Sequence, residues 1–477
     1  MLRSLSLALP VWIAVFSVCA THVDAQRPTN AGTLKQQAEA AYHKREFSKA
    51  IELTNQALVA TANDHEALYV RGSSRIELGI EAKDTQMVRD GIADTREAIR
   101  FEGNGKPEYY FPYIYGMSHL TELEGKNNHA ESALTVADSV LERQDLTGDQ
   151  RANLHYQRAQ AHSQLGKFPE AEADLNKAIQ ISPSHLASHM LLAEFAAKTG
   201  DADSASAAYT RVVQQFPTNP VVFNNRGMFY QSVGRAADAI NDFNKAIQLD
   251  NQFIPAYINR GYAYLEAGDS VNAEAALNQA LNVDPNQSGA ISLRATARLN
   301  QNKAQEALAD YRKVVEMSPK SPLAHADFGF AQFFTGNYQG ALNSFNTAIS
   351  LSNQTRFLFP WKLACEIRLN SVDQPSYQSM LTKPEEKQDW VDKLVLFQFG
   401  KLDATNLLKS ASASDPSGRE AQYCEGYYFI GMELQRRGRV QDAIAYWKQA
   451  ANRKNPKLSA YRGAVYAIGN ANNTTTR

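Results

Sequence analysis

The sequence predicts an all-α protein, a right-handed superhelical solenoid of about ten antiparallel helix pairs with an irregular C-terminal segment. Six alanines recur at intervals of 34 residues: Ala171, Ala205, Ala239, Ala273, Ala307 and Ala341. A small residue lies twelve positions before each of them: Ala159, Ala193, Gly227, Gly261, Ala295 and Gly329. A fixed period of this length indicates a stack of identical supersecondary units, which are stable only against their neighbours.

Each unit reads as two short helices. The small residue of the first helix and the alanine of the second allow the helix axes to approach closely. Glycines that need a left-handed backbone are expected to end the first helices, at Gly166, Gly200, Gly234, Gly268 and Gly336. Prolines are expected to follow the second helices, at Pro183, Pro217, Pro285 and Pro319.

Residues 31–355 resemble tetratricopeptide repeats. The segments Asn225-Arg226-Gly227 and Asn259-Arg260-Gly261 are of the kind common in bacterial proteins with these repeats. The resemblance implies the solenoid fold, whose inner wall is built by the first helices. It says nothing about the partner.

The domain organisation follows the period. We expect a signal peptide at 1–25, repeats with insertions at 26–151, six regular repeats at 152–355, a degenerate segment with a capping helix at 356–469 and a disordered tail at 470–477. In the second repeat Gly72 and Gly91 lie nineteen residues apart instead of twelve. We expect the seven extra residues, around Glu81 to Asp90, to form a loop.

The N-terminus has the features of an export signal. A short basic start precedes an apolar run from Leu5 to Ala20, and Val23-Asp24-Ala25 fits a cleavage site before Gln26. An uncleaved anchor and a lipid anchor on Cys19 are the alternatives. Export would place the protein in an oxidising compartment, where Cys365 and Cys424 are either two buried thiols or a disulfide pair. No other segment is long and apolar enough to cross a membrane.

Charge and motifs exclude several classes of function. The chain has 49 Lys and Arg against 50 Asp and Glu, without a basic run, so nucleic acid is not expected as a partner. No nucleophile–base pair, phosphate loop or metal cluster is recognisable, so neither an enzyme nor a cofactor is predicted. His185 and His189 lie four apart on a helix, which leaves a metal site as the alternative to packing.

The C-terminal third resembles a particular family. Trp361-Lys362-Leu363 is followed by Asp389-Trp390-Val391, then by Leu396 to Lys401 and Cys424 to Gly431. This order resembles the NlpI family of periplasmic tetratricopeptide adaptors, which hold peptidoglycan hydrolases and a processing protease. The resemblance covers about 350–469 and implies a role in the cell envelope. The chain lacks a convincing lipidation site and has a longer regular array, which puts anchoring, dimerisation and those partners in doubt.

Inner-wall positions of the repeats supply the candidate binding residues. They are Gln157, Gln160, Asn224, Asn225, Met228, Asn259, Tyr262, Leu265 and Asp327. Asn225 and Asn259 fall in the same frame of adjacent repeats, and carboxamides there would grip an extended peptide backbone. The alternative is that these asparagines cap or bridge neighbouring helices.

Aromatic and basic side chains recur as well. Phe330, Phe333 and Phe334, with Tyr262, would form an apolar anchor strip on the inner wall, unless the segment after Thr355 folds over them. One repeat position, directly before the small residue of the first helix, holds an arginine in four repeats: Arg158, Arg226, Arg260 and Arg294. We expect packed stems and hydrated guanidinium groups there, with a site for an acidic ligand as the alternative.

These observations favour an exported scaffold that binds a partner protein or peptide in its concave groove, and they leave homo-oligomerisation open. The alternative is a structural subunit of an envelope secretion or polysaccharide-export complex.

Overall fold

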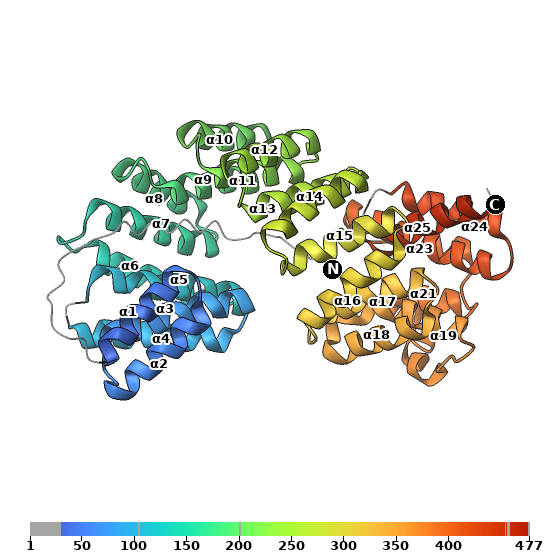
Figure 1. Ribbon diagram of the computed structural model, residues 1–477, viewed down its shortest axis with the longest axis horizontal. Helices are drawn as coiled ribbons and strands as arrows, with labels where there is room; N and C mark the ends of the chain where they lie inside the picture. The colour runs from blue at the N-terminus through green and yellow to red at the C-terminus, as the bar shows by residue number, and fades with distance from the viewer. Residues whose placement is uncertain (1–29, 104, 200–201, 454, 456–457, 476–477) are drawn as a thin grey trace. The chain divides into compact units, whose positions relative to one another are not determined.

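The computed structural model describes all residues except 1–29, 104, 200–201, 454, 456–457 and 476–477. The predicted signal peptide and Cys19 therefore lie outside the described residues. The described residues form 25 α-helices and three short 3-10 helices, with no strand (Figure 1). The all-α prediction is confirmed.

The chain divides into two compact units at Phe216 and Pro217, inside the array that the sequence predicts as continuous. The N-terminal unit contains α1 (Asn30–His43), α2 (Phe47–Ala60), α3 (His65–Ala82), α4 (Thr85–Glu102), α5 (Pro107–Glu124), α6 (Asn127–Leu141), α7 (Gly148–Gln164), α8 (Phe168–Ile181), α9 (Leu186–Thr199) and α10 (Ala202–Gln215).

The C-terminal unit begins with regular pairs and ends irregularly. The regular helices are α11 (Pro220–Ser232), α12 (Ala236–Leu249), α13 (Ile254–Glu266), α14 (Ser270–Val283), α15 (Ser288–Asn300), α16 (Ala304–Met317), α17 (Pro322–Phe334) and α18 (Tyr338–Leu351). The remainder is η1 (Asn353–Leu358), α19 (Phe359–Arg368), η2 (Gln374–Tyr377), α20 (Gln378–Leu381), η3 (Glu385–Lys387), α21 (Trp390–Gln398), α22 (Ala404–Lys409), α23 (Pro416–Arg436), α24 (Val440–Ala451) and α25 (Ser459–Thr475).

The helices form the predicted pairs. Within each unit, consecutive first helices also touch one another, α1 with α3, α3 with α5 and α5 with α7, then α11 with α13 and α13 with α15. We call the surface that these odd-numbered helices share the first-helix face.

The repeated small residues form the core between paired helices. All six alanines of the 34-residue ladder are fully buried. A Cβ at Gly261 would lie 2.7 Å from Leu277 Cγ, so a larger residue there would force α13 and α14 apart. The predicted turn glycines take the left-handed conformation, with φ of 73° at Gly166 and 83° at Gly336. Gly200 lies outside the described residues.

Two expectations about irregular segments are corrected. The seven extra residues of the second repeat do not form a loop, because they extend α3 and α4 to 18 residues each. The two helices meet closely at Gly72 and Gly91, so the longer pair still packs. At the C-terminus α25 continues to Thr475 instead of ending at the predicted tail, because no glycine or proline follows Gly469.

Three of the four arginines that share a repeat position pair with aspartates, which corrects the expectation of hydrated guanidinium groups there. Arg260 instead donates to Asn244 Oδ1 and to Gln279 Oε1. Arg226 donates from Nε and Nη2 to both carboxylate oxygens of Asp242, each at 2.7 Å. Arg158 with Asp174 and Arg294 with Asp310 repeat this geometry. Bidentate pairs of this kind fix the angle between the two helices of a repeat.

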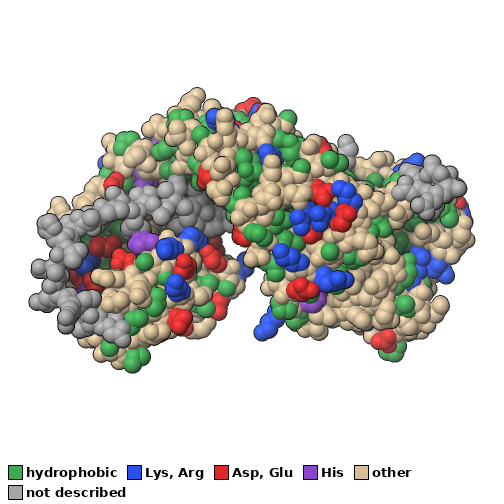
Figure 2. Space-filling view, in the orientation of Figure 1, with side chains coloured by type: hydrophobic (Ala, Val, Ile, Leu, Met, Phe, Trp, Pro, Cys, Tyr) green, Lys and Arg blue, Asp and Glu red, His purple; other side chains and the backbone are tan. Residues whose placement is uncertain are grey.

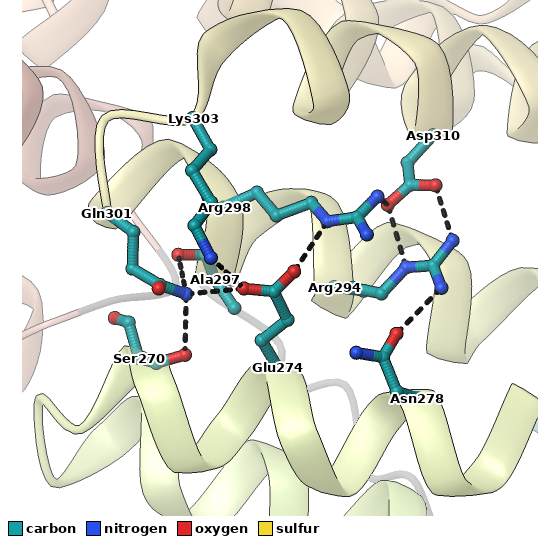
Figure 3. A network of polar contacts seen from close by, with 9 residues as sticks. All are labelled: Ser270, Glu274, Asn278, Arg294, Ala297, Arg298, Gln301, Lys303 and Asp310. Carbon is teal, nitrogen blue, oxygen red and sulfur yellow. Dashed lines mark hydrogen bonds and ion pairs between the residues drawn. The ribbon is translucent and has the colours of Figure 1, made fainter.

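One of these pairs extends into a network across repeats, which Figure 3 shows. Arg294 also donates to Asn278 Oδ1 at 2.8 Å, and Arg298 joins Asp310 to Glu274. Glu274 accepts further hydrogen bonds from Gln301 and Lys303. Because Glu274 lies on α14 and Asp310 on α16, the network fastens one repeat to the next.

Candidate peptide-binding face

Polar side chains of α11 and α13 meet on the first-helix face of the C-terminal unit. Asn259 donates from Nδ2 to Asn224 Oδ1 at 2.9 Å, and Asn224 donates to Asn225 Oδ1 at 3.2 Å. Met228 Sδ lies 3.6 Å from the same Asn224 nitrogen. We call Asn224, Asn225, Met228 and Asn259 the amide cluster.

The amide cluster bridges helices, as the alternative reading of these asparagines anticipated, but it does so through Asn224. Asn224 and Asn259 are both buried, at 4% and 8% exposure, whereas Asn225 is half-buried. Among the described residues, the Asn225 Nδ2 group and the Asn259 Oδ1 atom have no hydrogen-bond partner. A donor and an acceptor are therefore left over on neighbouring helices.

A second contact joins the same two helices one turn further on. Gln231 donates to Glu266 Oε2 at 2.6 Å, and the Tyr262 hydroxyl donates to Glu266 Oε1 at 2.8 Å. Burial raises the pKa of Glu266, and the hydrogen bond from Gln231 opposes that shift. Tyr262 is half-buried on this face, whereas Leu265 is 2% exposed and belongs to the core.

The predicted aromatic anchor is largely covered. Phe330 and Phe333 are each 4% exposed, and both pack against Trp361 of α19, with ring centroids 5.0 and 5.5 Å away. Phe334 is half-buried between Trp361 and Tyr428. The segment after Thr355 folds over the strip, so Phe330 and Phe333 are core residues and not exposed anchors.

The chain's own last helix occupies the face beside these aromatics. Helix α25 touches α15 and α17 (Figure 1). Its buried Arg462 donates to Asp327 Oδ1 at 3.0 Å and to the Tyr311 hydroxyl at 3.3 Å. Burial would lower the pKa of Arg462, but Tyr311 and Asp327 raise it. Asp327 is thus engaged inside the molecule, and the open part of this face lies on α11 and α13.

On the N-terminal unit the two predicted glutamines differ in role. Gln157 is 7% exposed and donates to the Phe111 carbonyl at 3.1 Å, so it ties α7 to α5. Gln160 is half-buried and donates to the Tyr156 hydroxyl at 3.1 Å. Of the two, Gln160 lies on the accessible part of the face.

Tyrosines and glutamates complete this face, and the sequence analysis missed them. We define the tyrosine–glutamate wall as the half-buried residues Tyr42, Tyr69, Glu77, Tyr156 and Glu194, from α1, α3, α7 and α9. Tyr69, Tyr156 and Glu194 lie at repeat positions that the amide cluster also uses, whereas Tyr42 and Glu77 lie at the positions of Gln231 and Glu266. Counting the 34-residue spacing backwards from the regular repeats, with Gly72 taken as the small residue of the second repeat, would have found them.

The two glutamates of the wall are held in an apolar setting. Burial raises the pKa of Glu77 to about 7, although Arg45 and His119 oppose the shift. Burial likewise raises the pKa of Glu194, against the attraction of Lys198. Within the described residues, neither carboxylate accepts a hydrogen bond or forms an ion pair closer than 4 Å.

The remaining chemical candidates fold into local structure. His185 Nδ1 lies 2.8 Å from Ser188 Oγ, and His189 Nε2 lies 3.0 Å from the Pro183 carbonyl oxygen. Both rings therefore make local hydrogen bonds at the start of α9. No group of three His, Cys, Asp or Glu side chains in the described part of the chain is placed to hold a metal. Cys365 and Cys424 are buried free thiols.

Surface charge is mixed, in keeping with the balanced composition. Figure 2 shows acidic and basic side chains interspersed on the visible surface, without a large area of one sign. Across the residues that the structure describes, no helix combines the length and the apolar character needed to cross a bilayer.

Family models identify the repeats directly. Models of the tetratricopeptide repeat match residues 123–185, 156–220 and 292–354, and a second such model matches 232–297. These stretches of the chain therefore consist of tetratricopeptide repeats, as the sequence analysis predicted. No curated protein sequence matches the chain.

Several solved structures are similar to parts of the chain. PilF of Pseudomonas aeruginosa is 19% identical over 47% of this chain and 99% of its own, with a TM-score of 0.37. YrrB, described as a tetratricopeptide protein with an unusual peptide-binding site, is 17% identical over 42% and 98%, with a TM-score of 0.32. MamA is 23% identical over 35% and 92%, with a TM-score of 0.32.

Proposed function

We propose that this protein is an exported scaffold that binds an extended segment of a partner protein on its first-helix face. The observation that carries the proposal is the pair of unpartnered groups in the amide cluster. Asn225 Nδ2 is a donor and Asn259 Oδ1 an acceptor, and a peptide unit offers the matching carbonyl and N–H. Hydrogen bonds to the backbone would hold a segment whatever its side chains.

The tyrosine–glutamate wall supports the same proposal for the N-terminal unit. Half-buried tyrosines supply large, rigid contact areas at a small cost in side-chain entropy, and aromatic residues are enriched where proteins bind one another. Tyr42, Tyr69 and Tyr156 come from three different first helices, so one extended segment would touch several repeats.

Export and a role in the cell envelope are part of the proposal. They rest on the signal-like residues 1–25 and on the likeness of residues 350–469 to periplasmic adaptors. Cleavage before Gln26 would be detected as the N-terminal residue of the protein recovered from a periplasmic fraction. Recovery with an intact Met1 in the cytoplasmic fraction would contradict export.

The binding test uses the full mature chain as bait in an envelope extract, followed by affinity measurement with the purified partner. Asn225→Ala removes the free donor together with the Oδ1 atom that accepts from Asn224, and it leaves the bond between Asn259 and Asn224 in place. We expect at least roughly tenfold weaker binding. Asn343→Ala, an exposed asparagine on α18, is the matched control.

Equal affinity of both variants would contradict binding through the amide cluster. Recovery of the protein only within a fixed membrane assembly would favour a structural subunit of a secretion or export complex instead.

A further inference from the structure

A cavity of about 310 Å³ lies in the C-terminal unit, apart from the amide cluster. Helices α17, α18, α23, α24 and α25 each contribute an aromatic ring to its lining. These rings are Phe333, Phe334, Tyr338, Tyr428, Trp447 and Tyr466. An apolar cavity of about 150 Å³ holds one benzene molecule, so this one has room for a ring and a short chain.

Among the described residues that line the cavity, Arg368, at the end of α19, is the only charged one. Its guanidinium donates from Nη2 to Gln435 Oε1 at 3.2 Å and stands 5.6 Å from the centre of the Tyr338 ring. Within the described residues it has no carboxylate within 4 Å. This contrasts with the paired arginines of the repeats, and it leaves a positive charge facing an aromatic cavity.

Tyr428 adds a second unsatisfied group. Its side chain is 3% exposed, and among the described residues its hydroxyl has no hydrogen-bond partner. Burial raises the pKa of Tyr428 and Arg368 opposes that rise, and both side chains line the same cavity. A hydroxyl that lines the cavity without a partner is a donor that a bound acceptor could use.

Both groups donate hydrogen bonds, and the walls around them are mainly aromatic and aliphatic, with Gln435, Gln441 and Asn470 as further polar members. Pockets for small molecules have this composition, in which aromatic walls bury the ligand and a few polar groups orient it. Guanidinium groups prefer carboxylates because they match the two oxygens. We propose that this cavity binds a compact apolar group that carries a carboxylate, with Arg368 and Tyr428 holding the acid and the aromatic rings holding the apolar part.

The test titrates the full mature chain with 3-phenylpropionate by calorimetry, and with its neutral amide as the matched ligand. We expect one-to-one binding of the acid, at least roughly tenfold tighter than binding of the amide. Arg368→Gln should remove that preference. Arg439→Gln, an exposed arginine that pairs with Asp442, should keep it.

Tyr428→Phe is the second variant, because it removes only the hydroxyl. It should weaken the binding of 3-phenylpropionate several-fold. Failure of the wild-type protein to bind 3-phenylpropionate, or equal binding of acid and amide, would overturn the proposal. N-acetyl-Ala-Ala-Phe with a free carboxylate distinguishes the two sources of the ligand. Binding as tight as that of 3-phenylpropionate indicates the end of a polypeptide, whereas exclusion of the tripeptide indicates a free acid.

Discussion

Glu77 shows how a single side chain on the first-helix face couples the fold to pH. It is a half-buried carboxylate whose charged neighbours are Arg45, His119 and Glu81. An ionised carboxylate in such surroundings loses hydration that these neighbours do not fully replace. The folded protein therefore binds a proton at Glu77 more readily than the unfolded chain does.

We predict that Glu77→Gln reduces the loss of stability as pH rises. An unfolded glutamate has a pKa of about 4.3, whereas that of folded Glu77 is about 7. Between these values the folded state holds more protons, so the free energy of unfolding falls as pH rises, and it levels off above pH 7.

Glutamine stays neutral, so the variant should gain about 1–3 kcal/mol relative to the wild type between pH 4 and pH 8. Urea unfolding followed by circular dichroism at both pH values measures this difference. A constant difference across the range would refute the prediction. Glu172→Gln, at an exposed position of α8, is the control.

At the scale of elements, the repeat period predicts which helices pair, but it does not predict every contact between them. The alanine ladder, the turn glycines and the closing prolines predict the paired helices because each depends on residues close in sequence. The Arg–Asp pairs were also within reach of the sequence. Asp174, Asp242 and Asp310 each lie three residues after an alanine of the ladder and sixteen after an arginine.

We predict that Asp310→Ala destabilises the C-terminal unit by about 2–4 kcal/mol. The substitution leaves Arg294 and Arg298 without their shared carboxylate in a half-buried site. Asp238→Ala removes an exposed partner of Arg235 and should cost less than about 0.5 kcal/mol. Equal midpoints of urea unfolding for the two variants would show that the network adds nothing to stability.

The candidate site was predicted less well than the fold, for two physical reasons. The repeat spacing places Asn225 and Asn259 at equivalent positions of adjacent repeats. The hydrogen bond between the two helices nevertheless joins Asn259 to Asn224, because it depends on the direction in which each side chain points. The fate of Phe330 and Phe333 depends on Trp361, which belongs to a segment without a repeat frame. The repeat spacing does not predict the contacts of a segment that lacks the repeat.

At the scale of the whole molecule, most contacts join neighbours in the stack. Gly91 tests how far a disturbance spreads, because a Cβ there would lie 2.7 Å from the Gly72 carbonyl oxygen. In a stack of repeats, stability is close to a sum of local terms.

We predict that Gly91→Ala increases amide hydrogen exchange in α3, α4 and the helices that touch them, while exchange in α23 to α25 stays unchanged. Mass spectrometry of peptic fragments measures this directly. Gly289→Ala, where the added methyl group meets open space, should change nothing. A uniform increase across the chain would mean that the molecule unfolds as one cooperative body.

Arg462 departs from this local pattern, since its partner Asp327 lies 135 residues earlier in the chain. Ordinary repeats can fold as soon as their immediate neighbours have been made, which keeps contact order low and folding fast. The repeats around Asp327 must instead wait for α25, whose Arg462 is synthesised 135 residues later. Until then Asp327 and the aromatic rings beside it would be uncovered, so the slowest step of maturation should be the closing of this end, and a chaperone that protects the nascent chain would be needed longest there.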